Sequence, residues 1–324
     1  MRRAVALIAT SILAAVLGGA LVWYRHVQQV AASARGTFPN GMAYVHVGTG
    51  SKTLLYLRGG TGVPFGRVFV LLSAIWMGPF LEDGYTIWVV ARKRGMPNGY
   101  EVENMADDTA TLIEDQFRGK VDVVIGEEAV GGMTAFLLAA RHPDTFRHLA
   151  VMLAGYRLSD EGRSFEREFA RLLSEGSTSE AGALWVRHMV PGLRVPGASR
   201  ILGPLIVRFM MGETYQSLAQ DVLVEVEAVS VFDGRAVLPG ITVPVLLIGC
   251  DKDSEFSRVV YEETARLIPD CSLRLYEGKT GFQAGSDKRL PQDVLEFVRR
   301  HGSRDAERAS NPVSSSEATV AAHA

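Results

Sequence analysis

The sequence predicts an α/β fold, a mainly parallel sheet with helices on both faces. Over most of the chain, short β-branched runs alternate with longer helical patterns, which is typical of such a sheet. Residues 158–235 break this alternation with helical periodicity alone and indicate a helical lid. The chain has 324 residues, of which 47% are apolar, enough to build a sizeable core.

The charge balance limits the classes of partner. Charged residues make up 22% of the chain, and the formal net charge is −2. No strongly basic face is implied, so we do not expect a nucleic-acid partner. We also expect no cofactor and no metal. The oligomeric state does not follow from the sequence.

The first residues predict a membrane anchor. Residues 4–24 hold no charged side chain, and a helix of that length covers about 30 Å, the hydrocarbon thickness of a bilayer. Trp23 and Tyr24 close the run where aromatic rings favour the interface. The alternative is a cleaved signal peptide, since residues 32–34 resemble a processing site. Charged Arg25 between the run and that site favours the retained anchor.

The anchor divides the chain into predicted segments. Arg2 and Arg3 favour a cytoplasmic N-terminal tail (1–3), which places the globular domain outside the cell membrane. A polar tether (25–38) then leads to the domain (39–301). The small, polar segment 302–324 is expected to be a disordered tail.

The domain opens with alternating strands and helices. Strands are predicted at 42–48, 53–59, 85–91, 121–126 and 148–155, and helices at 67–80, 102–117 and 133–142. After the lid, strands are predicted at 242–250 and 271–278, with helices at 258–268 and 290–301. If the last two strands are parallel neighbours, Cys250 and Cys271 lie at opposite ends of the sheet, too far apart for a disulfide.

Four sequence runs resemble the α/β-hydrolase fold superfamily, most closely its actinobacterial-type members. RGGTG (58–62) resembles the oxyanion loop, and the run from Gly131 to Gly155 resembles the helix and strand that follow the nucleophile. VPVLLIGCDKD (243–253) is similar to the strand carrying the triad acid, and RLYEGKTGF (274–282) to the loop carrying the histidine. The resemblance covers about residues 40–301.

The resemblance fails at the nucleophile. In that superfamily a G-x-S-x-G turn exposes a serine above the sheet. Counting forward from Gly126 places Glu128 in the position of the serine, and counting back from Gly131 and Gly132 places Ala129 there. The two registers differ by one residue, so an insertion in the turn is expected. Glu128 could be a carboxylate nucleophile, or simply an acid at a helix N-terminus.

The histidine position is also lost. The resemblance implies a histidine in the loop after the last strand, where this chain has Gly281. A serine enzyme needs that base to take the proton of the nucleophile, and a carboxylate enzyme needs it to activate water. The seven histidines lie elsewhere, and only His188, in the lid, could swing over the site.

The remaining site residues follow from the same resemblance. Asp253 occupies the position of the triad acid, with Asp251 as an alternative. Arg58 could anchor an anionic group or pair with a nearby acid. We predict Arg58, Gly60, Thr61 and Val130 as ligand-binding residues, with backbone N–H donors near Gly60 and after the apex of the turn.

Two functions are therefore weighed. The first is a membrane-anchored α/β-hydrolase-fold protein with an impaired site, which binds an apolar, lipid-like or amphipathic molecule, or a partner, beneath the lid; the apolar run 201–212 motivates the lipid-like ligand. The second is an active hydrolase of esters or related small substrates that uses Glu128 or a remote base.

Overall fold

A computed structural model describes residues 35–59, 76–189 and 215–310. Its eight-stranded sheet has the order β1-β2-β4-β3-β5-β6-β7-β8. The strands are β1 (Arg35–Thr37), β2 (Ala43–Val47), β3 (Lys52–Leu57), β4 (Tyr85–Val90), β5 (Val121–Glu127), β6 (Phe146–Met152), β7 (Val245–Lys252) and β8 (Cys271–Thr280). β2 is antiparallel to its neighbours β1 and β4, and the strands from β4 to β8 are parallel, which confirms the predicted mainly parallel sheet.

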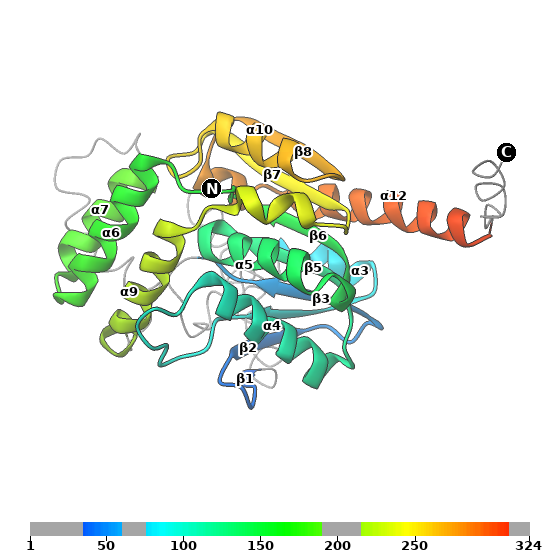
Figure 1. Cartoon of the computed structure of the whole chain (residues 1–324), viewed down its shortest axis with the longest axis horizontal. Helices are drawn as coiled ribbons and strands as arrows, with labels where there is room; N and C mark the ends of the chain where they lie inside the picture. The colour runs from blue at the N-terminus through cyan, green and yellow to red at the C-terminus, as the bar shows by residue number, and fades with distance from the viewer. Residues whose placement is uncertain (1–34, 60–75, 190–214, 311–324) are drawn as a thin grey trace, which may run out of the picture.

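Helices cover both faces of this sheet (Figure 1). They are α3 (Gly78–Glu82), α4 (Val102–Phe117), α5 (Glu128–Arg141), α6 (Asp160–Ser174), α7 (Thr178–Met189), α9 (Tyr215–Val231), α10 (Arg258–Leu267), α11 (Gly281–Gly285) and α12 (Leu290–Ser310). Capping fixes several ends: Glu101 and Asn104 form a capping box at the start of α4, and the Ser159 hydroxyl accepts the Gly162 N–H at the start of α6.

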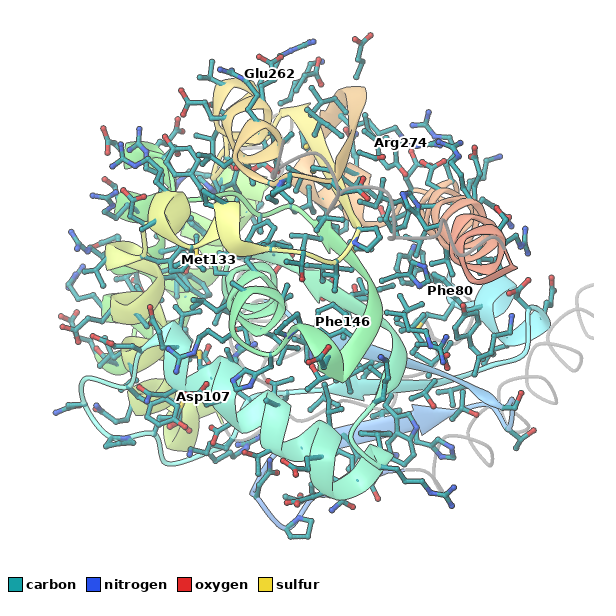
Figure 2. All side chains as sticks on the ribbon, turned by 45° about the vertical axis from the view of Figure 1, so that its right-hand side comes forward. Phe80, Asp107, Met133, Phe146, Glu262 and Arg274 are labelled. Carbon is teal, nitrogen blue, oxygen red and sulfur yellow. The ribbon has the colours of Figure 1, made fainter. Side chains whose placement is uncertain are left out.

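Two apolar layers hold the sheet between its helices. Successive strand side chains point to opposite faces, so Leu55 packs in the layer beneath α4, α5 and α10, while Leu54 packs in the layer beneath α3 and α12. Met133 and Phe146 lie inside the first layer and Phe80 inside the second, as Figure 2 shows. Burial on both faces explains why the central strands are almost entirely apolar.

The lid is helical in the part that the structure describes, as predicted. Helices α6, α7 and α9 share a small core of their own, which includes Phe165, Phe169 and Val222. In Figure 1 these helices lie together beyond one end of the sheet.

Charged and polar contacts fasten the lid to the sheet. Arg92, just after β4, bonds both carboxylate oxygens of Glu225 on α9 at 2.7 Å, and both side chains are buried. The Asp221 carboxylate accepts the N–H groups of Gly95 and Met96 at 3.2 and 2.8 Å. Removing one partner of a buried ion pair costs about 3–5 kcal/mol, so the Arg92–Glu225 pair fixes the position of α9 above the sheet.

Several predicted boundaries change. Residues 35–37 of the predicted tether form β1, which pairs with β2 in the register Arg35↔Val45. The first nine residues of the predicted disordered tail, 302–310, continue α12, whose end extends away from the domain in Figure 1. Most of the predicted helix 67–80 lies outside the described residues, and its end forms α3.

The predicted anchor at 4–24 also lies outside the described residues. Within the described part of the chain, no helix is long and apolar enough to cross a membrane. The cysteine prediction is confirmed: both thiols are free, and the β7–β8 register pairs Cys271 with Val245 and Cys250 with Tyr276, at separate ends of the shared ladder.

Candidate active site at the carboxyl end of the sheet

The turn between β5 and α5 places Glu128 at its apex. The strand ends at Glu127 and the helix begins at Glu128, whose φ is 53°. A positive φ is costly for a side chain with a Cβ, about 1–2 kcal/mol. Such a strained strand-to-helix turn is the geometry that presents a nucleophile above a sheet.

The structure selects the register counted forward from Gly126. Because strand and helix follow each other directly, the turn holds no extra residue, and the expected insertion is wrong. Ala129 is the first residue after the apex, and Val130 takes the position of the last glycine of a G-x-S-x-G turn. Gly131, from which the other register was counted, has a packing role instead. A Cβ there would lie 2.5 Å from the Leu57 carbonyl oxygen, so this glycine lets α5 pack against β3.

The end of β3 packs tightly against the same turn. A Cβ on Gly59 would lie 2.2 Å from the Glu127 carbonyl oxygen, so only glycine fits there. The Gly59 N–H donates to Glu127 Oε2 at 3.4 Å. A backbone donor at the start of the predicted oxyanion loop is therefore directed at a side-chain carboxylate. Gly60 and Thr61, predicted to bind ligand, lie outside the described residues.

Arg58 lies beside the two acids of the turn. Burial lowers the pKa of its guanidinium, and the negative charges of Glu127 and Glu128 oppose that effect. Its carbonyl oxygen accepts a hydrogen bond from Arg92 at 2.5 Å. Of the two roles weighed for Arg58, these surroundings favour charge balance with neighbouring acids.

Asp253 lies in the loop after β7, and among the described residues no imidazole contacts its carboxylate. Its carboxylate accepts the Tyr261 hydroxyl and the Glu255 and Phe256 N–H groups, the latter two at 2.9 and 3.3 Å. Burial raises the pKa of Asp253, and these hydrogen bonds oppose the rise. A Cβ on Gly281 would lie 3.8 Å from Asp253 Oδ1, so Gly281 holds the position from which a side chain would meet this acid.

The alternative acid, Asp251, is differently placed. It is exposed and accepts the Lys279 N–H at 3.2 Å, and hydrogen bonds from the loop hold its pKa below the usual range. The position next to Gly281 belongs to Asp253.

The described histidines are engaged elsewhere. The ring of His188 stacks on Phe165 with centroids 3.7 Å apart, inside the packing of α6 against α7. His142 contacts Asp107 at 2.8 Å, and the ring of His46 on β2 lies tilted against Trp88 on β4, with centroids 4.5 Å apart. His148 and His301 lie together near Phe297 on α12. His26 and His323 lie outside the described residues.

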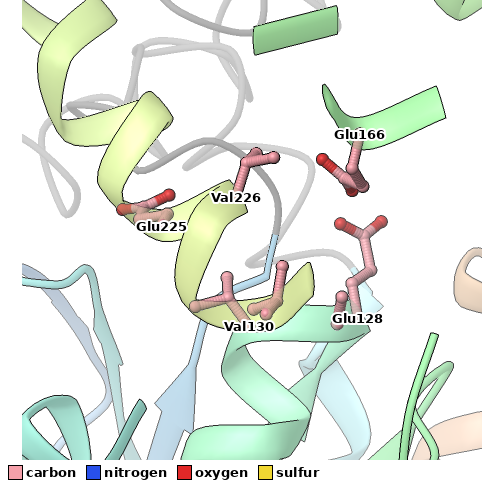
Figure 3. Close-up of a pocket in the computed structure, with 7 residues that line it drawn as sticks. Glu128, Val130, Glu166, Glu225 and Val226 are labelled. Carbon is pink, nitrogen blue, oxygen red and sulfur yellow. The ribbon is translucent and has the colours of Figure 1, made fainter. Parts of the chain in front are cut away.

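A small cavity lies above the turn, between α5 and the lid. It measures about 20 Å³ and is lined by three carboxyl-bearing residues and by small apolar ones, namely Glu128, Glu166, Glu225, Ala129, Val130, Val226 and Val229. The volume suits one water-sized group. In Figure 3 the carboxyl groups of Glu128 and Glu166 point toward each other across this space. Val130, predicted to bind ligand, lines the cavity.

Burial and the charges of neighbouring acids raise the pKa of both facing acids. Desolvation, followed by the charge of Glu127, raises the pKa of Glu128 to about 8, although Arg58 opposes the rise. Desolvation and Glu225 raise the pKa of Glu166 to about 7. Near neutral pH, Glu128 is therefore mainly a carboxylic acid, which can donate a proton but is a weak nucleophile.

Three acids of this site were not predicted from the sequence. Glu166 comes from α6, Glu225 from α9 and Glu255 from the loop before α10, all far from Glu128 along the chain. The available signal was a glutamate among apolar residues in α6 and in α9, namely Glu166 beside Phe165 and Phe169, and Glu225 beside Val224 and Val226.

Sheet order, covering helices, lid and strained turn together define the α/β-hydrolase fold. Solved structures share it: an enol-lactonase from Burkholderia xenovorans LB400 aligns over 80% of this chain and 96% of its own, with TM-score 0.62 and 19% identity. A hydrolase from Pseudomonas aeruginosa PA01 aligns over 82% and 97%, with TM-score 0.63 and 20% identity. A thermophilic esterase from Thermogutta terrifontis aligns over 80% and 93%, with TM-score 0.58 and 22% identity.

Those similarities establish the fold, while the chemistry depends on the residues of this chain. No protein-family model matches the chain, and no curated protein matches its sequence.

Proposed function

We propose that this protein binds a small molecule between the sheet and the lid without hydrolysing it. The observation that carries the proposal is the pair of substitutions at the reaction centre: Glu128 occupies the apex of the turn, and Gly281 leaves an empty position beside Asp253. The cavity above Glu128 supports a binding role, because lid and sheet enclose polar groups together with an apolar wall.

The chemistry of ester hydrolysis explains why both substitutions matter. Acyl transfer needs a nucleophile and a base that accepts its proton, and loss of either typically costs several powers of ten in rate. A glutamic acid with a pKa of about 8 is mostly protonated at pH 7, so it attacks poorly. Because no described imidazole lies beside Asp253, no such base would activate water to release the acid anhydride that attack on an ester would form on Glu128.

Ester turnover tests this proposal. We expect the full-length protein to hydrolyse p-nitrophenyl acetate at the same rate as its Glu128→Ala variant, measured as kcat/KM at pH 7 and pH 9. The higher pH ionises Glu128 and gives a carboxylate nucleophile its best opportunity. A wild-type rate about 100-fold or more above that of the variant would refute the proposal, since activation of a catalytic group contributes on this scale.

One feature of the cavity favours a second candidate, an acid–base hydrolase. Glu128 and Glu166 face each other, and a pair of facing carboxyl groups can divide the roles of acid and base. In that case Glu166→Gln would abolish hydrolysis as fully as Glu128→Gln does. Equal, background-level rates for both variants and the wild-type protein would exclude it.

A membrane tether is the other part of the proposal. The uncharged run at 4–24 would hold the domain at the cell membrane, on its outer side. We expect the full-length protein to stay with membranes during alkaline carbonate extraction. The double variant Ile12→Arg/Leu13→Arg places two charges mid-run and should release it. Release of the unchanged protein would contradict the tether.

A further inference from the structure

The hydrogen bonds of Asp253 give this acid a role that needs no histidine. We propose that Asp253 positions the lid over the turn by fixing the loop of residues 254–256, against which the first lid helix begins. The proposal goes beyond the proposed function, because it concerns where the lid lies and not whether a bound ligand is hydrolysed. In this role Asp253 is a positioning residue, which acts through the loop and not on a substrate.

Both oxygens of the Asp253 carboxylate have donors. Oδ1 accepts the N–H groups of Glu255 and Phe256 at 2.9 and 3.3 Å, which fixes the backbone of the loop. Oδ2 accepts the hydroxyl of Tyr261 on α10. The Tyr261 side chain is fully buried, and a Cβ on Gly249 would lie 2.7 Å from its ring, so the ring packs closely against β7. The Tyr261 hydroxyl therefore supplies a donor to this acid, as an imidazole does in the α/β-hydrolases that the chain resembles.

The start of α6 lies directly against the same loop. The Ser159 N–H donates to the Glu255 carbonyl oxygen at 2.9 Å, and the Ser159 hydroxyl donates to the Ser254 carbonyl oxygen at 3.4 Å. That hydroxyl also accepts the Gly162 N–H at 3.0 Å and so caps the helix. A Cβ on Gly162 would lie 2.8 Å from the Glu255 Cα, so helix and loop are in close contact. The loop therefore fixes the position of the first turn of α6.

The segment that leads from β6 into the lid packs on the same part of the molecule. A Cβ on Gly155 would lie 2.6 Å from the Val260 side chain and 3.2 Å from the Phe256 ring. The Tyr156 N–H donates to the Thr264 hydroxyl on α10 at 2.9 Å. The other end of the lid is fastened separately, by the ion pair and the carboxylate contacts of α9 described above. The Asp253 loop is therefore specific to the α6 end of the lid.

The helix that this loop positions forms one wall of the cavity above the turn. Glu166 on α6 faces Glu128 across a space of about 20 Å³, so a small displacement of α6 would let further water reach both carboxyl groups (Figure 3). Burial is the largest cause of the raised pKa of Glu128. Loosening of the Asp253 loop would therefore hydrate Glu128 and lower its pKa from about 8 toward its ordinary value of 4.5.

Amide hydrogen exchange of the full-length protein tests the proposal. Asp253→Ala removes the acceptor of the loop, so we expect the amides of α6 to exchange at least about tenfold faster, measured relative to those of the central strand β6, which report global unfolding. Asp253→Asn keeps a side-chain oxygen for the two loop N–H groups, and its α6 exchange should stay within about threefold of the wild-type rate. Asp115→Ala, on the exposed face of α4, is the matched control and should leave α6 exchange unchanged.

The pKa of Glu128, measured by ¹³C NMR and assigned with Glu128→Gln, gives a second readout. Both substitutions of Asp253 remove a charge that contributes to the raised pKa of Glu128. Only Asp253→Ala also loosens the lid, so we expect its Glu128 pKa to lie at least about 1 below that of Asp253→Asn.

Tyr261→Phe tests the same loop without changing the acid. It keeps the buried ring and removes the hydroxyl that holds Asp253, and it should speed α6 exchange relative to β6 about threefold or more. This variant decides the question if Asp253→Ala does not fold. Unchanged α6 exchange in a folded Asp253→Ala or in Tyr261→Phe would overturn the proposal. So would equal acceleration in the alanine and asparagine variants, since the charge of Asp253 and not its acceptor would then matter. Ester turnover measures a different property, so the proposed function and the role of Asp253 in the lid can fail independently.

Discussion

The double variant Glu128→Ser/Gly281→His is expected to hydrolyse esters much faster than either single variant. Serine would stand at the apex of the strained turn, where φ is 53°. A histidine at position 281 would start 3.8 Å from Asp253 Oδ1, an ordinary contact distance, and Gly281 does not have a left-handed φ that would exclude a side chain. The Thr280–Gln283 capping box holds the loop in place.

The size of the gain follows from the role of the base. General-base assistance contributes about 10²- to 10⁴-fold, so we expect the double variant to exceed Glu128→Ser by at least about 100-fold in kcat/KM for p-nitrophenyl acetate. Adding Asp253→Asn should remove most of that gain, because the acid orients the imidazole. If the folded double variant were no faster than Glu128→Ser, the positions assigned to Glu128, Gly281 and Asp253 would be wrong.

The second large effect concerns the free energy of unfolding, which the raised pKa of Glu128 lowers as the pH increases. The pKa of Glu128 is raised from 4.5 to about 8, so the native protein keeps this proton while the unfolded chain loses it above about pH 4.5. Between these two values the unfolded chain binds fewer protons than the native protein. This contribution to stability therefore falls as pH rises from about 4.5 to 8, and levels off above that.

Glu128→Gln should remove this loss. One pKa unit corresponds to about 1.4 kcal/mol. Because Glu166 shares the repulsion, we expect the free energy of unfolding of the variant to exceed that of the wild-type protein by about 3 kcal/mol at pH 8.5. That corresponds to a rise in Tm of roughly 5–10 °C for a domain of this size. At pH 5 the native wild-type protein holds Glu128 protonated, and the glutamine of the variant is also uncharged. The Tm values of the two proteins should therefore agree at that pH. Glu114→Gln serves as the exposed control; a Tm gain that is the same at both pH values would contradict the raised pKa of Glu128.

Local signals in the sequence predicted most of the fold. Helix α4 occupies 102–117 as expected, because its apolar period and the capping box of Glu101 and Asn104 are both local features. The boundaries that changed depend on non-local contacts or on helix propensity. β1 exists through its pairing with β2, and 302–310 extend α12 because their alanine, arginine and glutamate residues are good helix formers.

The site was less accessible from sequence. Gly131 suggested a turn glycine, yet its role is close packing of α5 against the Leu57 carbonyl. The relation of Gly281 to Asp253 followed from the resemblance, whereas the carboxyl cluster did not. Glu166 and Glu255 meet Glu128 only once α6 and the loop after β7 fold over the sheet. The spacing of these residues along the chain therefore does not predict that they lie close together.

Isotope labelling tests most directly whether Glu128 acts as a nucleophile. The protein is incubated with excess styrene oxide in H₂¹⁸O, digested, and the peptide containing Glu128 is weighed by mass spectrometry. A carboxylate that forms and hydrolyses a covalent ester exchanges an oxygen with water in each cycle. We expect no ¹⁸O in the Glu128 carboxyl group above that of a control without substrate. Substrate-dependent ¹⁸O at Glu128 would show that the turn still performs covalent catalysis.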